Sequence, residues 1–441
     1  MKKILSFAIA LVFALTFVGS MRPSNAQAED NLVEVNFPTY LAGENVGAIF
    51  FGPQVERFNA KYEGQYKITV EEVPQAAYAE KIKQLALQQQ LPVLIHSPGS
   101  GGIDLQWFHQ VIVANDLAHD LTAFAEANPE VSDSWLDASV DYCTFDGKLL
   151  VKPSAVIRPI GLYYNHTMFD PETDISQMTP EEFMQALVDA DQKVALMTGE
   201  NAWTTSLFLS CFIANQEDGA DFLSQHADDK LYDYSDERIV KGVEQLLQFF
   251  NESAASNSLG AAYAEAANAF MSKQAAVIAN GSWMAGDFSE ASADKWSNDF
   301  TGDDVKATLY PGNIAIANER MFGEFWISAN ASEEEKALAE AFIAFRDSKE
   351  EVEAFMLAEG GVAPKLDVSE EFLAAQEENR ILNELSTAIN DETIYSDNIL
   401  SVMPASVADS EFGKLLPKLF DGTLTPEDFC AELTRKAEEA R

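Results

Sequence analysis

Residues 32–95 decide the fold class. They open with LVEVNF (Leu32–Phe37), in which apolar and polar residues alternate as in a half-buried strand. Four further segments continue the pattern, helical at 48–62 and 78–87 and strand-like at 66–73 and 91–95. This β-α-β-α-β order is typical of a mostly parallel sheet covered by helices. It predicts an α/β protein.

Three helix starts further along the chain carry recognisable caps. Residues 179–182 (TPEE) and 425–428 (TPED) each offer a Thr before a Pro and two acidic residues, and residues 332–335 (SEEE) form a capping box. A hydroxyl before the first turn can accept a backbone N–H hydrogen bond, and acidic residues suit the helix dipole. We therefore expect helices to begin at these three points, the last of them running to the C-terminus.

Composition bounds the class of protein. The 441 residues include 29 Lys plus Arg and 71 Asp plus Glu, for a formal charge of −42, and 47% are hydrophobic. That apolar content can bury a large core, and the length indicates two or three domains. The negative charge excludes nucleic acid and anionic membrane surfaces as partners, because both would be repelled.

The N-terminus has the pattern of a secretory signal peptide. Lys2 and Lys3 precede an apolar stretch over 4–18, and Ala26-Gln27-Ala28 offers a small-x-small cleavage site. A membrane anchor is the alternative, but the apolar run is shorter than the roughly 20 residues that span a bilayer. No cysteine lies near the cleavage site, so a lipid anchor is not expected. We predict cleavage after about Ala28 and a soluble periplasmic protein.

Few residues point to catalysis or metal binding. The chain has no GxSxG or GxxxxGK[ST] motif, and its five histidines form no HxxxH or HxH pair, so we expect no catalytic centre, no metal and no cofactor. Cys143, Cys211 and Cys430 fit no zinc or redox spacing and are expected to be buried, although a disulfide between two of them stays open. With 71 acidic residues, a carboxylate pair of a secreted glycosidase also stays open.

Tryptophans give a positive signal for a ligand site. Trp203, Trp283 and Trp326 each lie within two residues of a polar side chain. Aromatic faces pack on the apolar C–H faces of sugar rings, while nearby polar groups bind hydroxyls. The spacing therefore indicates a carbohydrate site, with core packing as the alternative for each Trp.

A stretch in the second half of the chain carries a family resemblance. Residues 269–283 (AFMSKQAAVIANGSW) resemble a helix, strand and Trp found in family 1 extracellular solute-binding proteins, which include maltose- and glycerol-3-phosphate-binding proteins. Similar blocks follow the family order at 146–153 with 162–165, at 179–183, at 325–328 and at 360–364. The sequence departs from the family at Lys273-Gln274, at Pro92-Val93, and at a Gly-Gly pair of which only Gly323 remains.

This resemblance implies a periplasmic-binding-protein fold. Two lobes, each a mixed sheet flanked by helices, would be joined by crossing hinge strands and would close on a ligand in the cleft. The N-terminal lobe is expected at 29–152 plus about 306–348, and the C-terminal lobe at 153–305 plus about 349–441. The resemblance also implies a monomer that delivers its ligand to the permease subunits of an ABC importer.

The resemblance also implies which residues contact the ligand. Trp283 ends the best-matching motif, where the family's Trp stacks on the ligand, and Arg158 lies in the first crossing segment. A guanidinium there could bind sugar hydroxyls, a carboxylate or a phosphate, or could form an ordinary salt bridge. The full set of expected ligand contacts is Tyr40, Asn45, His96, Ser97, Arg158, Trp203, Ser282, Trp283, Phe322, Glu324 and Trp326.

A sugar- or oligosaccharide-binding protein is the leading functional hypothesis. Glycerol 3-phosphate or a related phosphorylated polyol is the alternative ligand, although the C-terminal region lacks the second phosphate-directed Arg in a Gly-Ile-Arg-like stretch that would indicate it. A secreted glycosidase is the alternative enzyme. A sensor subunit that reports to a membrane receptor is the remaining alternative.

Overall fold

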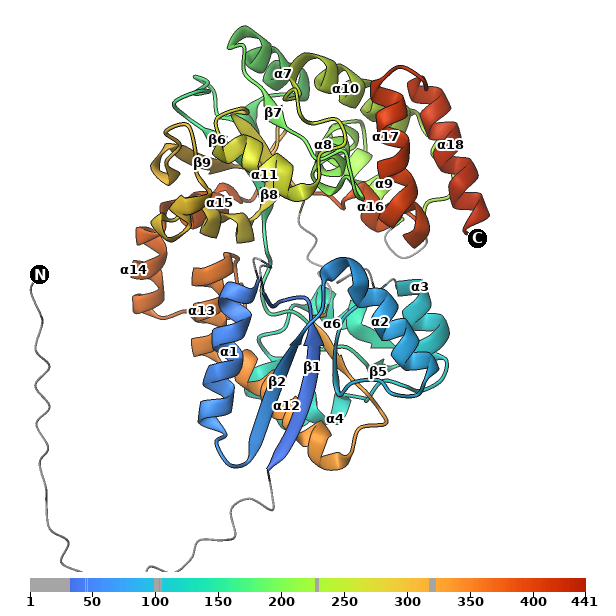
Figure 1. Ribbon diagram of the computed structural model, residues 1–441, viewed down its shortest axis with the longest axis vertical. Coiled ribbons are helices and arrows are strands. Elements are labelled where there is room, and N and C mark those ends of the chain that lie inside the picture. The colour runs from blue at the N-terminus through green and yellow to red at the C-terminus, as the bar shows by residue number, and fades with distance from the viewer. Residues whose placement is uncertain are drawn as a thin grey trace, which may run out of the picture.

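The computed structural model describes residues 32–43, 45, 47–98, 103, 105–226, 230–316 and 323–441. The predicted signal peptide and Phe322 lie outside the described residues. Figure 1 shows two lobes stacked along the long axis of the molecule. Within the described ranges, every helix is too short or too polar to cross a bilayer.

The N-lobe gathers one hydrophobic core from residues 33–156 and 325–372. In it β1 pairs in parallel with β2, and β3 pairs antiparallel with β11. Its elements are β1 (Val33–Thr39), α1 (Ala48–Lys61), β2 (Tyr66–Glu72), α2 (Gln75–Leu87), β3 (Leu94–His96), α3 (Leu105–Trp107), η1 (Phe108–Val113), α4 (Thr122–Ala127), α5 (Pro129–Ser132), α6 (Asp137–Cys143), β4 (Thr144–Phe145), β5 (Lys148–Leu149), β11 (Phe325–Ile327), α12 (Glu333–Arg346), α13 (Lys349–Glu359) and α14 (Glu370–Glu378).

The C-lobe is built on a four-stranded mixed sheet with the strand order β7-β8-β6-β9. Its core residues come from 162–316 and 381–437. Its elements are β6 (Ile160–Asn165), η2 (Ile175–Gln177), α7 (Pro180–Asp189), β7 (Val194–Ala195), α8 (Trp203–Ala214), α9 (Gly219–Gln225), α10 (Glu237–Ser253), α11 (Tyr263–Met271), β8 (Val277–Gly281), η3 (Ser282–Phe288), η4 (Glu290–Lys295), η5 (Gly302–Asp304), β9 (Val305–Thr308), β10 (Ile314–Ala315), α15 (Arg380–Ala388), β12 (Ile394–Tyr395), α16 (Ile399–Val402), η6 (Val407–Glu411), α17 (Phe412–Phe420) and α18 (Pro426–Glu439).

The sequence patterns predict where helices and strands lie better than they predict the directions of the strands. The expected strands and helices of 32–95 are present as β1, α1, β2, α2 and β3. However, β11 runs antiparallel to β3, and β6 runs antiparallel to both of its neighbours. These two strands adjoin the segments that pass between the lobes, so they do not arise from the local β-α-β repeat. The sheets are therefore mixed rather than mostly parallel.

The chain passes between the lobes in three places. The first passage is the segment 157–159, and the second lies between β10 and β11. The third leads from α14, where Phe372 packs in the N-lobe core, into α15, which packs in the C-lobe core. Ile157 and Val362 exchange two backbone hydrogen bonds of 2.8 and 2.9 Å, so the residues after α13 lie against the first passage.

The lobe boundaries differ from those expected at two points. Residues 306–316 belong to the C-lobe, because β9 pairs with β6 and Tyr310 and Ile314 lie in the C-lobe core. Residues 349–372 belong to the N-lobe, because α13 buries its apolar side in the N-lobe core. Amphipathic spacing shows which side of a helix is buried but not which lobe covers it.

The caps and the cysteines agree with the sequence analysis. Thr179 and Ser332 form capping boxes with Glu182 and Glu335, and Thr425 accepts the Asp428 N–H at 3.1 Å. The three cysteines are buried and free. Burial raises the pKa of Cys143 and of Cys430 to about 12, so these thiols are unreactive packing residues.

Candidate functional site

The ends of β6 and β8 bring the first passage beside the Trp283 motif. The two strands pair antiparallel, and just beyond the ladder the Ser282 N–H donates to the Pro159 carbonyl at 3.0 Å. This register sets Arg158 next to Trp283. The guanidinium carbon of Arg158 lies 4.7 Å from the centroid of the Trp283 ring, a cation–π distance. One predicted ligand contact thus supports another at the point where the lobes meet.

Two half-buried tryptophans stand together here. Trp203, the first residue of α8, lies with its ring centroid 5.7 Å from that of Trp283, at an interplanar angle of 37°. The Trp283 ring lies directly over Gly281, where a Cβ atom would come within 2.2 Å of the ring. A side chain at position 281 would therefore displace the indole. The packing of the indole therefore requires glycine at position 281, two residues before Trp283.

Tyr263 extends this aromatic group and was not found by the sequence analysis. It is the first residue of α11 and is half-buried, and its hydroxyl accepts a hydrogen bond of 3.0 Å from the Asn280 amide. Burial raises the pKa of Tyr263, and hydrogen bonds with Asn280 and Trp283 offset part of that shift. Asn280 and Trp283 lie in the quoted motif, but the partner on the preceding helix gave no separate signal.

Two polar atoms beside the tryptophans lack hydrogen-bond partners among the described residues. They are Nε of Arg158 and Oγ of Ser282, and Ser282 is only 1% exposed. A buried polar group without a partner costs roughly 1–3 kcal/mol, so such groups are usually satisfied by water or a ligand. The tryptophan pair therefore has a guanidinium donor and a hydroxyl beside it, both buried and without partners among the described residues.

Arg158 also forms the salt bridge that the sequence left as an alternative. Its Nη2 donates to Oε2 of Glu359 at 2.7 Å, and its guanidinium carbon lies 5.4 Å from the ring centroid of Phe355. Glu359, at the end of α13, is 7% exposed. Burial raises the pKa of Glu359, although the charges of Arg158 and Arg346 act in the opposite direction. The carboxylate thus joins α13 of the N-lobe to the first passage.

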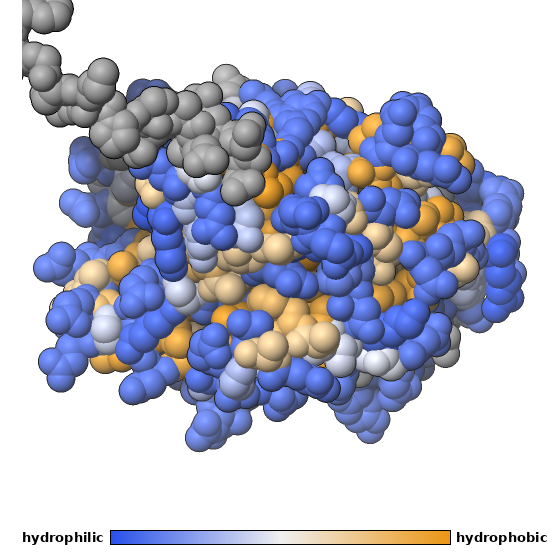
Figure 2. Space-filling view, turned by 90° about the horizontal axis from the view of Figure 1, so that it is seen from below, coloured by the Kyte–Doolittle hydropathy of each residue, from blue (hydrophilic) through white to orange (hydrophobic). Residues whose placement is uncertain are grey.

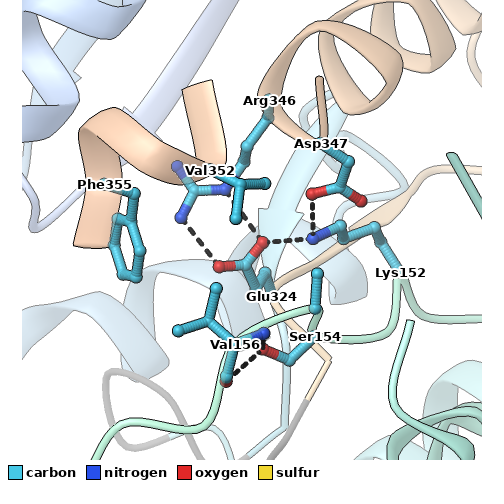
Figure 3. A pocket seen from close by; sticks show the side chains of 9 residues that line it. Lys152, Ser154, Val156, Glu324, Arg346, Asp347, Val352 and Phe355 are labelled. Carbon is cyan, nitrogen blue, oxygen red and sulfur yellow. Dashed lines mark hydrogen bonds and ion pairs between the residues drawn. The ribbon is translucent and has the colours of Figure 1, made fainter. Parts of the chain in front are cut away.

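Glu324 lies in a separate buried charge cluster (Figure 3). Its carboxylate accepts two hydrogen bonds from Arg346, at 2.7 and 2.8 Å, and lies 2.5 Å from Nζ of Lys152. Lys152 is also 2.7 Å from Asp347. Burial disfavours the ionised form of Glu324, but the charges of Arg346 and Lys152 outweigh it and hold the pKa of Glu324 below its usual range.

This cluster leaves Glu324 little capacity for a ligand. The cavity beside it measures about 10 Å³ and is lined by Lys152, Ser154, Ala155, Val156, Glu324, Arg346, Asp347, Val352 and Phe355. Such a space holds a water molecule at most, and no sugar ring. Glu324 keeps 22% of its side chain exposed, but both of its carboxylate oxygens are engaged by Arg346 and Lys152.

His96 and Ser97 lie inside the N-lobe. His96 is 2% exposed, its Nε2 lies 2.7 Å from the Thr39 hydroxyl, and its ring packs 4.5 Å from that of Tyr40. Burial, with a smaller contribution from Arg346, lowers the pKa of His96 to about 3, so its ring is neutral. Ser97 is fully buried, and its N–H donates to the Glu324 carbonyl. Neither side chain is open to the space between the lobes.

Trp326 is a core residue. It is fully buried, its indole N–H donates to the His96 carbonyl at 3.0 Å, and its ring packs edge-to-face on Phe108. Tyr40 and Asn45 keep partial exposure in the loop between β1 and α1. The Asn45 side chain accepts the Gly47 N–H at 2.9 Å, which orders the start of α1. Of the expected N-lobe contacts that the structure describes, these two and Glu324 keep partial exposure.

The chain resembles solved structures over nearly its whole length. A chitin oligosaccharide binding protein matches with a TM-score of 0.71 at 18% identity, over 92% of this chain and 98% of that chain. A Streptococcus pneumoniae solute-binding protein in complex with the blood group A-trisaccharide matches at 0.70 and 16%, over 93% and 100%. The sugar-binding protein MalE from the phytopathogen Xanthomonas citri matches at 0.63 and 13%, over 92% and 97%. These likenesses show the two-lobed fold.

The remaining comparisons concern sequence. No curated protein matches the chain. Among the described residues, no group of His, Cys, Asp and Glu side chains is arranged to hold a metal ion. A family model with the description "Bacterial extracellular solute-binding protein" matches residues 54–380. This range is most of the chain and includes parts of both lobes. The resemblance stated from the sequence is confirmed, and the protein belongs to the family of bacterial extracellular solute-binding proteins.

Proposed function

We propose that the protein captures a sugar or oligosaccharide between its lobes in the periplasm and delivers it, as a monomer, to the permease of an ABC importer. The observation that carries the proposal is the Trp203–Trp283 pair beside the unpartnered Arg158 Nε and Ser282 Oγ. The sugar-binding solved structures of the same fold support the ligand class. The hydrophilic surface between scattered apolar residues in Figure 2 suits a freely diffusing carrier.

Binding in this proposal is non-covalent. A sugar ring stacks on Trp283 and Trp203, and its hydroxyls meet Arg158 Nε and Ser282 Oγ. Tyr40 and Asn45 approach from the N-lobe as the lobes close. The three passages between the lobes supply the hinge, since a few residues at element ends can absorb such a rotation. Closure excludes water and strengthens each hydrogen bond.

A neutral saccharide fits this site better than glycerol 3-phosphate. A phosphate needs uncompensated cations, and Arg158, Arg346 and Lys152 are each ion-paired with a carboxylate. The alternative of a secreted glycosidase predicts turnover. Incubation with oligosaccharides followed by an assay for new reducing ends separates the two, and any turnover would contradict a binding-only function.

A thermal-shift screen tests the ligand class directly. The panel is maltotriose, xylotriose, raffinose, triacetylchitotriose and glycerol 3-phosphate. A ligand at 100 times its dissociation constant stabilises the folded state by about 2.7 kcal/mol, which is a shift of several degrees at most in a chain of this size. We expect at least one neutral saccharide to give such a shift, confirmed by calorimetry. A panel in which only the phosphate binds would overturn the proposal.

A further inference from the structure

The Arg158 guanidinium is enclosed by groups from three parts of the chain. Trp283 of the C-lobe lies on it at 4.7 Å, Phe355 of α13 lies at 5.4 Å, and Glu359 accepts its Nη2–H at 2.7 Å. The two partners of the ion pair are 201 positions apart in the chain. Two aromatic rings and a carboxylate therefore fix the side chain, with Nε left free of a partner within the described part of the chain.

Glu359 occupies one end of the Arg158 guanidinium and also approaches the start of α1. Its Oε1 lies near the start of α1, 3.6 Å from where a Cβ of Gly47 would be. The helix α1 has no acidic residue in its own first turn, and a carboxylate near a helix N-terminus is favourably placed relative to the helix dipole. Glu359 thus neutralises the guanidinium and lies near the helix terminus.

We propose that Glu359 is a specificity-determining residue, which keeps carboxylate- and phosphate-bearing ligands out of the interlobe site by occupying the Arg158 guanidinium. The inference rests on the proposed function, since it concerns the same site. An anionic group that reached Arg158 would lie beside the Glu359 carboxylate, and like charges repel strongly where water is excluded. A hydroxyl oxygen beside the carboxylate carries no such penalty.

The nearby carboxylates Glu324 and Asp347 are already bound to other cations and do not contact Arg158. Arg346 is held in bidentate contact with Glu324, and Lys152 contacts both Glu324 and Asp347. Removing the Glu359 charge would therefore leave Arg158 as a cation without a counter-ion beside the tryptophans. Such a guanidinium binds a carboxylate or phosphate with short, charge-assisted hydrogen bonds.

The test compares Glu359→Gln with wild type on matched probes. The probes are the neutral saccharides of the thermal-shift panel and the same saccharides oxidised at one primary hydroxyl to a carboxylate, one derivative for each such hydroxyl, together with glycerol 3-phosphate. Wild type should bind every anionic probe at least 100-fold more weakly than its neutral parent. E359Q should bind at least one anionic probe at least ten-fold more tightly than wild type does, by calorimetry.

Matched controls isolate the charge at the site. Glu351 lies on the same helix, is also buried, and is paired with Arg57 away from the tryptophans, so Glu351→Gln should bring no gain. The double variant Arg158→Gln with E359Q should lose the gain. Glu359→Ala removes the same charge and replaces E359Q should that variant fail to fold.

Three results would overturn the inference: no gain in a folded Glu359 variant, an equal gain in E351Q, or a gain that survives in the double variant. Failure of the proposed function looks different. It would show as a wild-type protein that binds none of the neutral saccharides, whatever Glu359 does.

Discussion

The two lobes place similar residues at strand ends but use them differently. At the end of β8 in the C-lobe, Ser282 and Trp283 leave an aromatic face and a polar atom unused. At the end of β3 in the N-lobe, His96 and Ser97 are sealed beneath Tyr40 and beside β11. A position at a strand end therefore does not by itself predict an unpartnered polar atom. The unpartnered Ser282 Oγ distinguishes the C-lobe strand end, although Ser282 is as buried as His96 and Ser97.

The carboxylates Glu324 and Glu359 also differ in how their surroundings shift the pKa. The pKa of Glu324 is lowered because two cations outweigh its burial, whereas the pKa of Glu359 is raised because burial outweighs its partners. The surroundings of Glu324 thus favour its ionised form, whereas the burial of Glu359 disfavours ionisation. Substitutions at these positions can separate residues that stabilise the molecule from residues that bind.

Glu324→Gln should have the largest effect. It leaves Arg346 and Lys152 without their shared anion, and breaking a buried ion pair from one side costs about 3–5 kcal/mol. Glu359→Gln should change the free energy of unfolding far less, because a carboxyl with a raised pKa is disfavoured when ionised. Urea denaturation of the two variants at pH 7 measures the difference. Equal losses of unfolding free energy would show that the two carboxylates contribute equally to stability and would contradict this prediction.

The pH dependence of these two groups has opposite signs. The lowered pKa of Glu324 supplies stability above the pKa of the unfolded chain, and this stability is lost as the pH falls through the folded value. The raised pKa of Glu359 acts in reverse, so lowering the pH through it relieves a penalty. Wild type should therefore gain stability relative to E359Q as the pH falls.

Trp326→Ala tests the core side of the comparison. Truncating a fully buried Trp and stranding the His96 carbonyl should lower the free energy of unfolding by about 3–5 kcal/mol. In the fraction that stays folded, saccharide affinity should be preserved. Denaturation and calorimetry on the same sample check both. A large loss of affinity at unchanged stability would return Trp326 to the binding site.

Trp283→Ala tests the binding side. Loss of the stacking surface should weaken binding of the best neutral saccharide by about 1–3 kcal/mol. The ring is half-buried, so stability should fall less than in W326A. Trp203→Ala should change affinity in the same direction. Calorimetry with wild-type affinity in W283A would remove the aromatic pair from the site.

Much of the fold was predictable, and less of the site. Local patterns such as the caps at Thr179 and Ser332 and the alternation in β1 depend on neighbours in sequence, and they are present as expected. Residues such as Glu359 act through partners far away in the chain, so spacing gave no signal for it. The burial of Trp326 likewise depends on its pairing with β3, which the sequence did not specify.

The smallest effect is expected at His96. Burial lowers its pKa to about 3, so its ring should remain neutral between pH 6 and 8 and its NMR ring resonances should not titrate there. Saccharide affinity should therefore not change through ionisation of His96 between pH 6 and 8. Since the unfolded chain takes up the proton near its ordinary pKa, stability is retained above about pH 6.5 and falls as the pH drops toward 3. A titration midpoint near 6.5 in the folded protein would instead place His96 in contact with water, and it would rejoin the residues that can face a ligand between the lobes.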